Sequence, residues 1–184
     1  MGRLVCAGLV SLDGYIADAA GRFEWAAPDA EVHAFVNDLE RGIGTYLYGR
    51  RMYEVMRFWE SAGPELGDVE RAYAEIWRSA DKVVFSRTLD EVTTARTRLV
   101  RSFDPMRVRE LVRGSARDVS IAGPNVASAA FRAGLVEEVH TFLVPVSVGG
   151  GTRFLPDDVR LDLELVGADR FAGGTVHLHH RVRR

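Results

Sequence analysis

The sequence predicts one α/β domain over residues 1–184, with a mostly parallel central sheet, helices on both faces and antiparallel strands at the C-terminal end. Short β-prone apolar runs alternate with helical segments along most of the chain, which is typical of parallel sheets. The last two runs, 161–166 and 175–182, have only a glycine turn between them and predict an antiparallel pair. A chain of 184 residues with 47% hydrophobic side chains suits a single core.

The N-terminal half predicts strands that end in turn residues or in the start of a helix. In chain order these elements are a strand over 3–10, a helix capped by Asp29 and closed by Gly42 and Gly44, a strand over 45–48, a helix over 50–58, a helix begun at Asp68 and a strand over 82–85. The helices are predicted from apolar residues at three- and four-residue intervals, as in Val32, Phe35, Val36 and Leu39.

The C-terminal half continues the alternation and then changes to strands alone. A strand over 97–100 precedes a helix that Asp104 caps, with Pro105 at its first position. A strand over 119–122 ends at Gly123-Pro124, and Asn125 is predicted to cap a helix that runs to Arg132 and closes at Gly134. A long strand over 136–146, broken by Pro145, leads through a triple-glycine loop to the final pair.

Charge and composition exclude some classes of protein and leave one question open. The net charge of −2 argues against a general nucleic-acid binder, which usually presents a basic face. The positive charge is almost all arginine, since Lys82 is the single lysine. Codon bias explains this, and so does recognition of phosphate by the planar arginine fork. Composition does not separate the two interpretations.

The single cysteine and the absence of long apolar runs bear on the cellular compartment. Cys6 lies in the first apolar run, so no internal disulfide and no cysteine-based zinc site is expected. The N-terminus lacks the apolar region and cleavage site of a signal peptide. No apolar stretch approaches the roughly 20 residues of a membrane span. We therefore expect a cytoplasmic protein with no membrane partner.

Four predicted strand ends carry unusual chemistry. They are Ser11-Leu12-Asp13-Gly14, Gly49-Arg50-Arg51, Ser86-Arg87-Thr88 and Gly123-Pro124-Asn125. Parallel sheets bind ligands beyond the carboxyl ends of their strands, and free N–H groups at helix starts suit anions. Each motif alone is equally an ordinary turn or helix start. Their joint placement at successive strand ends is what predicts a site for a phosphorylated ligand.

Other motifs are absent or have a simpler interpretation. No Gly-x-Gly-x-x-Gly follows the first strand and no Walker A motif occurs, so neither a standard Rossmann site nor a P-loop is expected. His177, His179 and His180 lie on the last predicted strand, and His177 and His179 share a face. No carboxylate or cysteine lies close to them in sequence. We therefore predict a solvated terminal strand and no metal site.

The ordered set of motifs resembles the dihydrofolate-reductase-like superfamily, and most of all free-standing relatives of the riboflavin-biosynthesis (RibD) C-terminal reductase domain. The segments that carry the resemblance are 11–17, 46–54, 82–88, 121–125, 134–138, 145–146 and 149–151. The resemblance covers nearly the whole chain, and the combination is specific although no single segment is. The signature of a zinc deaminase domain needs cysteines that this chain lacks.

The resemblance implies NADPH as the cofactor and assigns residues to its parts. The segments expected to flank the adenosine 2′-phosphate are Gly49-Arg50-Arg51 with Met52, and Ser86-Arg87-Thr88. The residues expected to meet the pyrophosphate at a helix N-terminus are Gly123, Pro124, Asn125, Val126 and Ala127. Those expected to border the nicotinamide and substrate are Ser11, Asp13, Gly14 and Ala17.

Two positions depart from the family pattern. Met52 stands where relatives commonly have threonine, which removes one hydroxyl contact to the cofactor. Gly123-Pro124 stands where dihydrofolate reductases have a Gly-Gly pair joined by a cis peptide. Proline tolerates the cis form best, so the sequence predicts a cis Gly123-Pro124 bond that preserves the sharp turn.

The function that the resemblance implies is NADPH-dependent hydride transfer to a small pterin-, folate- or pyrimidine-like substrate. Asp13 is the candidate catalytic residue, as proton relay or substrate anchor, and Trp25, Tyr53 and Phe58 are candidates for the apolar substrate wall or for core packing. The alternative is a non-catalytic NADP(H)-binding regulatory or sensor protein. A flavin-dependent enzyme has little support. The resemblance also implies a homodimer, formed through the C-terminal strands.

Overall fold

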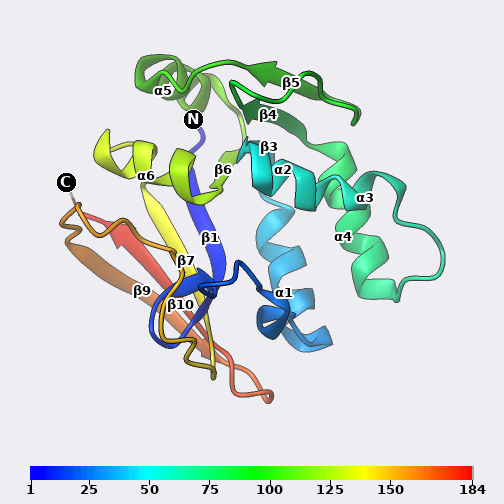
Figure 1. The fold of residues 1–184 in the computed structure, drawn as a ribbon, viewed down its shortest axis with the longest axis vertical. Helices are drawn as coiled ribbons and strands as arrows, with labels where there is room; N and C mark the ends of the chain where they lie inside the picture. Colours follow the sequence, from blue (N-terminus) through cyan, green and yellow to red (C-terminus); the bar gives the residue numbers. More distant parts are fainter. Residues whose placement is uncertain (184) are drawn as a thin grey trace.

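The computed structural model describes residues 1–183 and, within them, shows one large sheet and one small one (Figure 1). The large sheet has eight strands in the order β5-β4-β3-β6-β1-β7-β10-β9. The bounds of its strands are Leu4–Ser11 (β1), Ile43–Gly49 (β3), Asp81–Phe85 (β4), Thr97–Val100 (β5), Asp118–Ala122 (β6), Glu138–Val144 (β7), Leu163–Arg170 (β9) and Val176–Val182 (β10). The small sheet pairs β2 (Tyr15–Ala17) with β8 (Thr152–Arg153).

The pairing of the strands confirms the predicted topology. β5, β4, β3, β6, β1 and β7 are all parallel neighbours, whereas β10 pairs antiparallel with both β7 and β9. The carboxyl ends of β4, β3, β6, β1 and β7 therefore lie along one edge of the sheet in that order. The amino ends of the same strands form the opposite edge.

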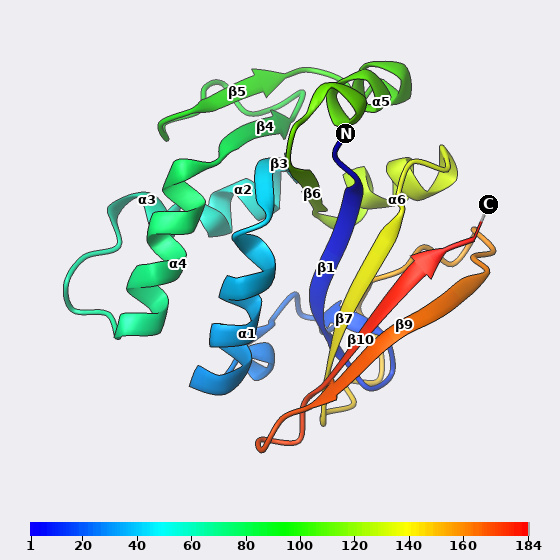
Figure 2. The same ribbon diagram turned by 180° about the vertical axis from the view of Figure 1, so that it is seen from behind.

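Helices cover both faces of the sheet, as the alternation of elements predicts (Figure 2). The helices are α1 (Ala30–Glu40), α2 (Arg50–Met56), α3 (Phe58–Ser61), α4 (Asp68–Ser79), α5 (Pro105–Gly114) and α6 (Pro124–Arg132), with a 3₁₀ turn η1 (Glu24–Ala26). The core on one face takes residues from α5 and α6, such as Val108 and Phe131. The cores on the other face take residues from α1, α2 and α4, such as Val32, Tyr53 and Trp77.

Helix starts follow the predicted capping chemistry in two cases and not in a third. The Asp29 carboxylate accepts from the Val32 N–H at 2.9 Å, and the Asp104 carboxylate accepts from the Met106 N–H at 2.9 Å. The predicted Asn125 cap is wrong, because the N-cap lies two residues earlier at Gly123 and α6 begins at Pro124. The helix therefore starts directly at the strand end.

The predicted cis bond between Gly123 and Pro124 is also wrong, because the described residues contain no cis peptide. The sharp turn comes instead from Gly123 itself, whose φ of 107° lies in a region that other residues rarely adopt. Proline then occupies the first helical position, where its missing N–H costs no hydrogen bond.

The remaining differences concern the limits of elements and one small sheet. The helix predicted over 50–58 ends at Met56, and a second helix, α3, begins at Phe58. Gly44 lies inside β3 rather than closing α1, and β9 runs to Arg170, beyond the predicted end at residue 166. Neither β2 nor β8 was predicted, because strands of three and two residues carry almost no sequence pattern. Among the helices of the described residues, none has the length and apolar character needed to cross a membrane.

Candidate functional site

The candidate site is the carboxyl edge of the parallel strands. Ser86 follows β4, Gly49 ends β3, Gly123 follows β6 and Ser11 ends β1, and these strands are spatial neighbours. The four motifs singled out in the sequence therefore lie side by side. Helices α2 and α6 both begin at this edge (Figure 1). The first N–H groups of a helix have no partner within the helix, so those of α2 and α6 face this edge.

At the middle of this edge the N-caps of α2 and α6 meet through two glycines. A Cβ atom on Gly123 would lie 3.2 Å from the Gly49 nitrogen and 3.5 Å from the Met52 Cβ. Any side chain at Gly123 would press on the neighbouring backbone and hold an unfavourable φ. The close approach places two helix N-termini at one point, where their partial positive charges add.

A cluster of arginines lies at the β4 end of the edge. The Arg50 guanidinium donates to the Thr88 hydroxyl at 3.0 Å and pairs with Glu54 at 3.0 Å, so it joins α2 to the loop after β4. The buried Ser86 hydroxyl shapes that loop by accepting from the N–H groups of Thr88 and Leu89. Arg51 and Arg87 are exposed, and neither guanidinium has a hydrogen bond or ion pair within residues 1–183. This cluster is electropositive and accessible.

The loop after β1 forms the other end of the edge. The buried Ser11 hydroxyl accepts a hydrogen bond from the Tyr15 N–H at 2.9 Å, and the Gly14 N–H donates to the Ser11 carbonyl at 2.9 Å. The Leu12 N–H donates to the Val146 carbonyl at 2.7 Å, so the loop is joined to the segment after β7. Ser11 is therefore a residue that shapes the turn from within.

Asp13 occupies a position that the sequence does not reveal. Its carboxylate accepts from the N–H groups of Val148 at 3.1 Å and Gly149 at 2.7 Å. The Ser11 hydroxyl, followed by these two N–H groups, holds the pKa of Asp13 well below its usual range. The carboxylate is therefore an anion at neutral pH and links the first loop to the triple-glycine loop.

Around this link the small β2–β8 sheet brings the two loops together. The Arg153 guanidinium donates to the Asp13 carbonyl at 3.3 Å and lies 4.5 Å from the centre of the Tyr15 ring. A Cβ on Gly151 would lie 2.1 Å from the Ala17 carbonyl oxygen, so only glycine permits this approach. These contacts join residues more than 130 positions apart, and no local sequence signal indicates them.

The three predicted substrate residues are not gathered at one place. Tyr53 is buried, and its hydroxyl accepts from the Thr93 N–H at 2.8 Å, on the α2 side of the sheet. Phe58 is exposed and borders a cavity of about 390 Å³, together with Glu54, Arg57, Glu60, Ser61, Thr93 and Thr94. Trp25 lies on η1, which packs against β1, and donates to the Arg22 carbonyl at 3.1 Å. Trp25 alone lies on the β1 side.

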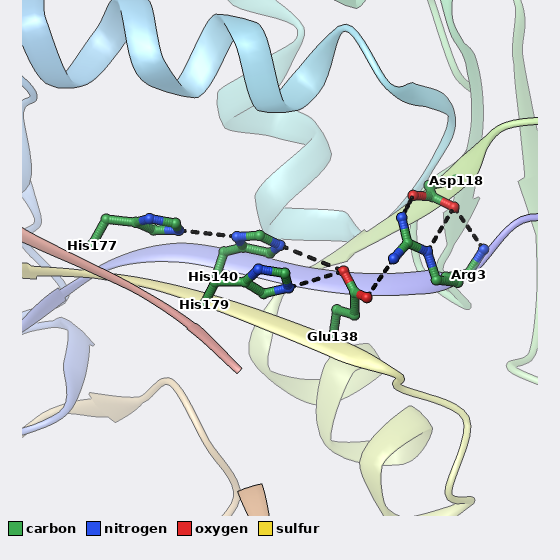
Figure 3. Close-up of polar contacts among 6 residues, drawn as sticks. All are labelled: Arg3, Asp118, Glu138, His140, His177 and His179. Carbon is green, nitrogen blue, oxygen red and sulfur yellow. Dashed lines mark hydrogen bonds and ion pairs between the residues drawn. The ribbon is translucent and has the colours of Figure 1, made fainter. Parts of the chain in front are cut away.

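A second group of polar residues lies away from this edge, where the sequence predicted solvent and no metal. Glu138 and His140 share a face of β7, and His140 is paired directly with His179 of β10 (Figure 3). His140 and His177 are 5% and 3% exposed, so the prediction of a solvated strand is wrong for His177. No local sequence signal indicates this burial, because the carboxylates come from neighbouring strands, Glu138 from β7 and Asp169 from β9.

Burial determines the charge state of these two histidines. Desolvation, followed by the neighbouring His179 and His177, lowers the pKa of His140 to about 3. Burial also lowers the pKa of His177, although Asp169 opposes that shift. Both rings are therefore neutral at pH 7.

The strand-end edge has features that fit a dinucleotide phosphate. It offers two glycine-headed helix starts for a pyrophosphate and unpaired arginines for a further phosphate. The cavity beside Phe58 is not lined by any of the glycines that head these helices. The fit rests on the exposed N–H groups and guanidinium groups, and not on an enclosed pocket.

Comparisons with known proteins agree with this fold. This chain is similar in structure to a putative riboflavin biosynthesis protein from Shewanella sp. PV-4, with TM-score 0.77, 18% identity and 99% of each chain covered. A pyrimidine reductase-like protein from Corynebacterium diphtheriae has TM-score 0.72 and 12% identity, with 100% of this chain and 92% of that chain covered. A search of curated proteins found no match.

A bifunctional protein from Thermotoga maritima shows how this chain relates to larger enzymes. It is described as a diaminohydroxyphosphoribosylaminopyrimidine deaminase and 5-amino-6-(5-phosphoribosylamino)uracil reductase. The match has TM-score 0.68 and 17% identity, and it covers 99% of this chain but 57% of the Thermotoga chain. The model of the RibD C-terminal domain matches residues 3–177. The chain therefore belongs to the RibD C-terminal domain family.

Proposed function

We propose that this RibD-type reductase binds NADPH along the carboxyl edge of its sheet and reduces a small pyrimidine-like heterocycle. The observation that carries the proposal is the meeting of the α2 and α6 N-termini at Gly49 and Gly123, beside the exposed arginines. When bound, NADPH supplies a hydride to the carbon of a C=N or C=O group, and a proton from water completes the reduction. The chain's own task is to position the reactants.

Each end of the edge has a proposed role. Arg50 and Arg87 bind the 2′-phosphate, for which arginine provides fixed, charged donors. The N–H groups of Asn125 and Val126 at the start of α6 bind the pyrophosphate, whereas that of Ala127 already donates to the Gly123 carbonyl at 2.9 Å. The loop at 11–17 lies at the opposite end, and we place the nicotinamide and the substrate there.

Asp13 is the polar group at this reacting end. Its low pKa leaves it ionised at neutral pH, so it has no proton to donate. A carboxylate accepts hydrogen bonds only, and a pyrimidine-type ring offers N–H donors. We therefore propose Asp13 as an acceptor that anchors the substrate and orders the loop, with Trp25 of η1 as the nearest candidate for an apolar contact. Tyr53 and Phe58 lie on the other side of the sheet, where Tyr53 is buried and is assigned to packing and Phe58 is exposed.

The reductase domain of the Thermotoga protein acts on an aminouracil, and this supports a pyrimidine-type substrate for the present chain. The proposal includes a cytoplasmic location, because NADPH-dependent biosynthetic reduction takes place there.

Calorimetric titration with NADPH and NADH tests the proposal. We expect NADPH to bind more tightly, and Arg87→Gln to weaken NADPH by about 10- to 100-fold, as for loss of a charged hydrogen bond. NADH affinity is expected to stay unchanged. Arg160→Gln serves as the control, because Arg160 pairs with Asp162 and lies outside the edge.

The outcomes separate the competing functions. NADPH binding followed by oxidation with an aminopyrimidine, pterin or folate supports a reductase. Binding with no oxidation across that panel supports a non-catalytic NADP(H)-binding protein. Failure to bind either nucleotide contradicts the cofactor assignment.

A further inference from the structure

The polar cluster on β7 and β10 contains a hydrogen-bond chain that ends on a carboxylate. The Asp169 carboxylate only accepts, so the Nδ1 of His177, 3.0 Å away, donates to it. The Nε2 of His177 lies 3.0 Å from the Nδ1 of His140 and can accept its proton. In that arrangement the Nε2 of His140, which faces Glu138, is the nitrogen left to bind a metal (Figure 3).

The Nε2 of His140 faces a carboxylate. It lies 3.9 Å from the Glu138 Oε2, a separation too long for a hydrogen bond. The Nε2 of His179 lies 3.0 Å from the same oxygen. Two imidazole nitrogens and a carboxylate oxygen, all of them possible metal ligands, therefore lie side by side at the end of two stacked rings, whose centres are 4.1 Å apart with 14° between their planes.

We propose that Glu138, His140 and His179 form a binding site for a divalent metal ion of the zinc class. Two imidazoles and a carboxylate are a ligand set that zinc accepts, with its fourth position left open. The three ligand atoms all lie within 4.8 Å of one another. Metal–ligand bonds of about 2.0–2.2 Å place tetrahedral ligand atoms about 3.3–3.6 Å apart, so the separations of 3.0 and 3.9 Å need only small changes. The His179 ring is stacked on His140, so it must also turn out of the stack for both rings to bind one ion.

The surroundings hold the ligands in place. His140 is fixed by His177 and Asp169, as metal-binding histidines usually are by a second partner. The other oxygen of Glu138 accepts from Arg3, which is itself paired with Asp118 at 2.8 Å. Binding requires His179 to carry its proton on Nδ1, and its side chain is 21% exposed, so water can exchange that proton.

The open position has access to solvent and lies far from the cofactor edge. A cavity of about 230 Å³, lined by Arg3, Glu137, Glu138, Arg181 and Val182, borders the cluster. Glu138 is the first residue of β7, at the amino edge of the parallel strands. The metal would therefore join β10 to β7 and takes no part in hydride transfer. The site does not depend on the proposed reductase function.

Calorimetric titration with Zn²⁺ tests the site, using protein without a histidine tag and stripped of metal by a chelator. We expect one zinc ion per chain and a rise in the melting temperature. His179→Gln and Glu138→Gln are expected to lose this binding. His180→Gln is the matched control and is expected to bind normally, because His180 pairs with Val139 and lies on the opposite face of β10.

Two further measurements keep the result clear if a buried variant folds poorly. Asp169→Ala alters only the outer partner and is expected to lower zinc affinity by about 10- to 100-fold. Co²⁺ in place of zinc is expected to show the intense visible absorption of a tetrahedral site. Failure of the wild-type chain to bind zinc overturns the proposal. So does binding that persists in folded His179→Gln, or that His180→Gln removes equally.

Discussion

At the scale of single residues, folding changes the pKa of the Glu40 carboxyl, and this change can be tested. It ends α1, is 7% exposed, and its Oε2 has no hydrogen-bond partner among the described residues. Burial raises the pKa of Glu40 to about 7, despite the opposing effect of the Tyr46 hydroxyl. The folded chain therefore binds this proton more tightly than the unfolded chain, whose carboxyl has a pKa of 4.5.

The consequence is a stability that falls as pH rises. The contribution of the protonated form is complete below about pH 4.5 and is lost as pH rises to about 7. Glu40→Gln keeps the shape without the charge, so it should be more stable than wild type at pH 8 by about 3 kcal/mol. Urea unfolding at pH 5 and pH 8 measures the difference.

Asp38→Asn is the control for this variant, because it removes an exposed carboxyl from the same helix. It should leave the pH dependence of stability unchanged. Equal stability of Glu40→Gln and wild type at pH 8 would show that Glu40 is not destabilised by its burial.

At the scale of elements, Asp13 connects two loops that are far apart in the sequence. Its carboxylate holds the N–H groups of Val148 and Gly149, next to the β2–β8 sheet. Asp13→Ala removes both acceptors, so the amides of residues 147–151 should exchange hydrogen faster while those of β7 stay protected. Asp13→Asn keeps one carbonyl acceptor, so its exchange rates for these amides should lie between those of wild type and of Asp13→Ala. Hydrogen exchange with mass spectrometry measures this.

Kinetics of the Asp13→Asn variant separate the two roles considered for Asp13. If Asp13 relays a proton, Asp13→Asn should lower kcat and change its pH profile. If it anchors the substrate, the variant should mainly raise KM. Unchanged turnover in Asp13→Asn would exclude both roles and leave Asp13 as a structural link alone.

The elements also show what the sequence could and could not predict. Strands with continuous apolar runs and helices with aspartate caps were predicted correctly, because their signals are local, as at Asp104 and Pro105. The turn at Gly123 was predicted with the wrong peptide geometry, because a positive φ and a cis bond both produce a sharp bend. The buried histidines were missed because their partners lie on neighbouring strands, and only the pairing of β7, β10 and β9 brings them together.

At the scale of the whole molecule, β9 is the edge strand on which the predicted homodimer depends. It is exposed along most of its length, and Leu165 and Val166, which are successive, are 58% and 45% exposed. Two adjacent apolar side chains are therefore uncovered on this strand. Uncovered edge strands promote association between chains.

The register suggests how two copies would meet. His179 pairs with Gly167 and His180 with Leu165, so a bulge interrupts the β9–β10 ladder at Val166. Bulges weaken the pairing of edges between chains, which favours contact through side chains over extension of the sheet.

We expect light scattering to give twice the chain mass of 20.4 kDa. Leu165→Lys should then give the monomer mass, whereas Met106→Lys, at an exposed position on α5, should remain a dimer. A wild-type monomer would remove the dimer from the proposal, and a dimer that survives Leu165→Lys would place the interface on another surface.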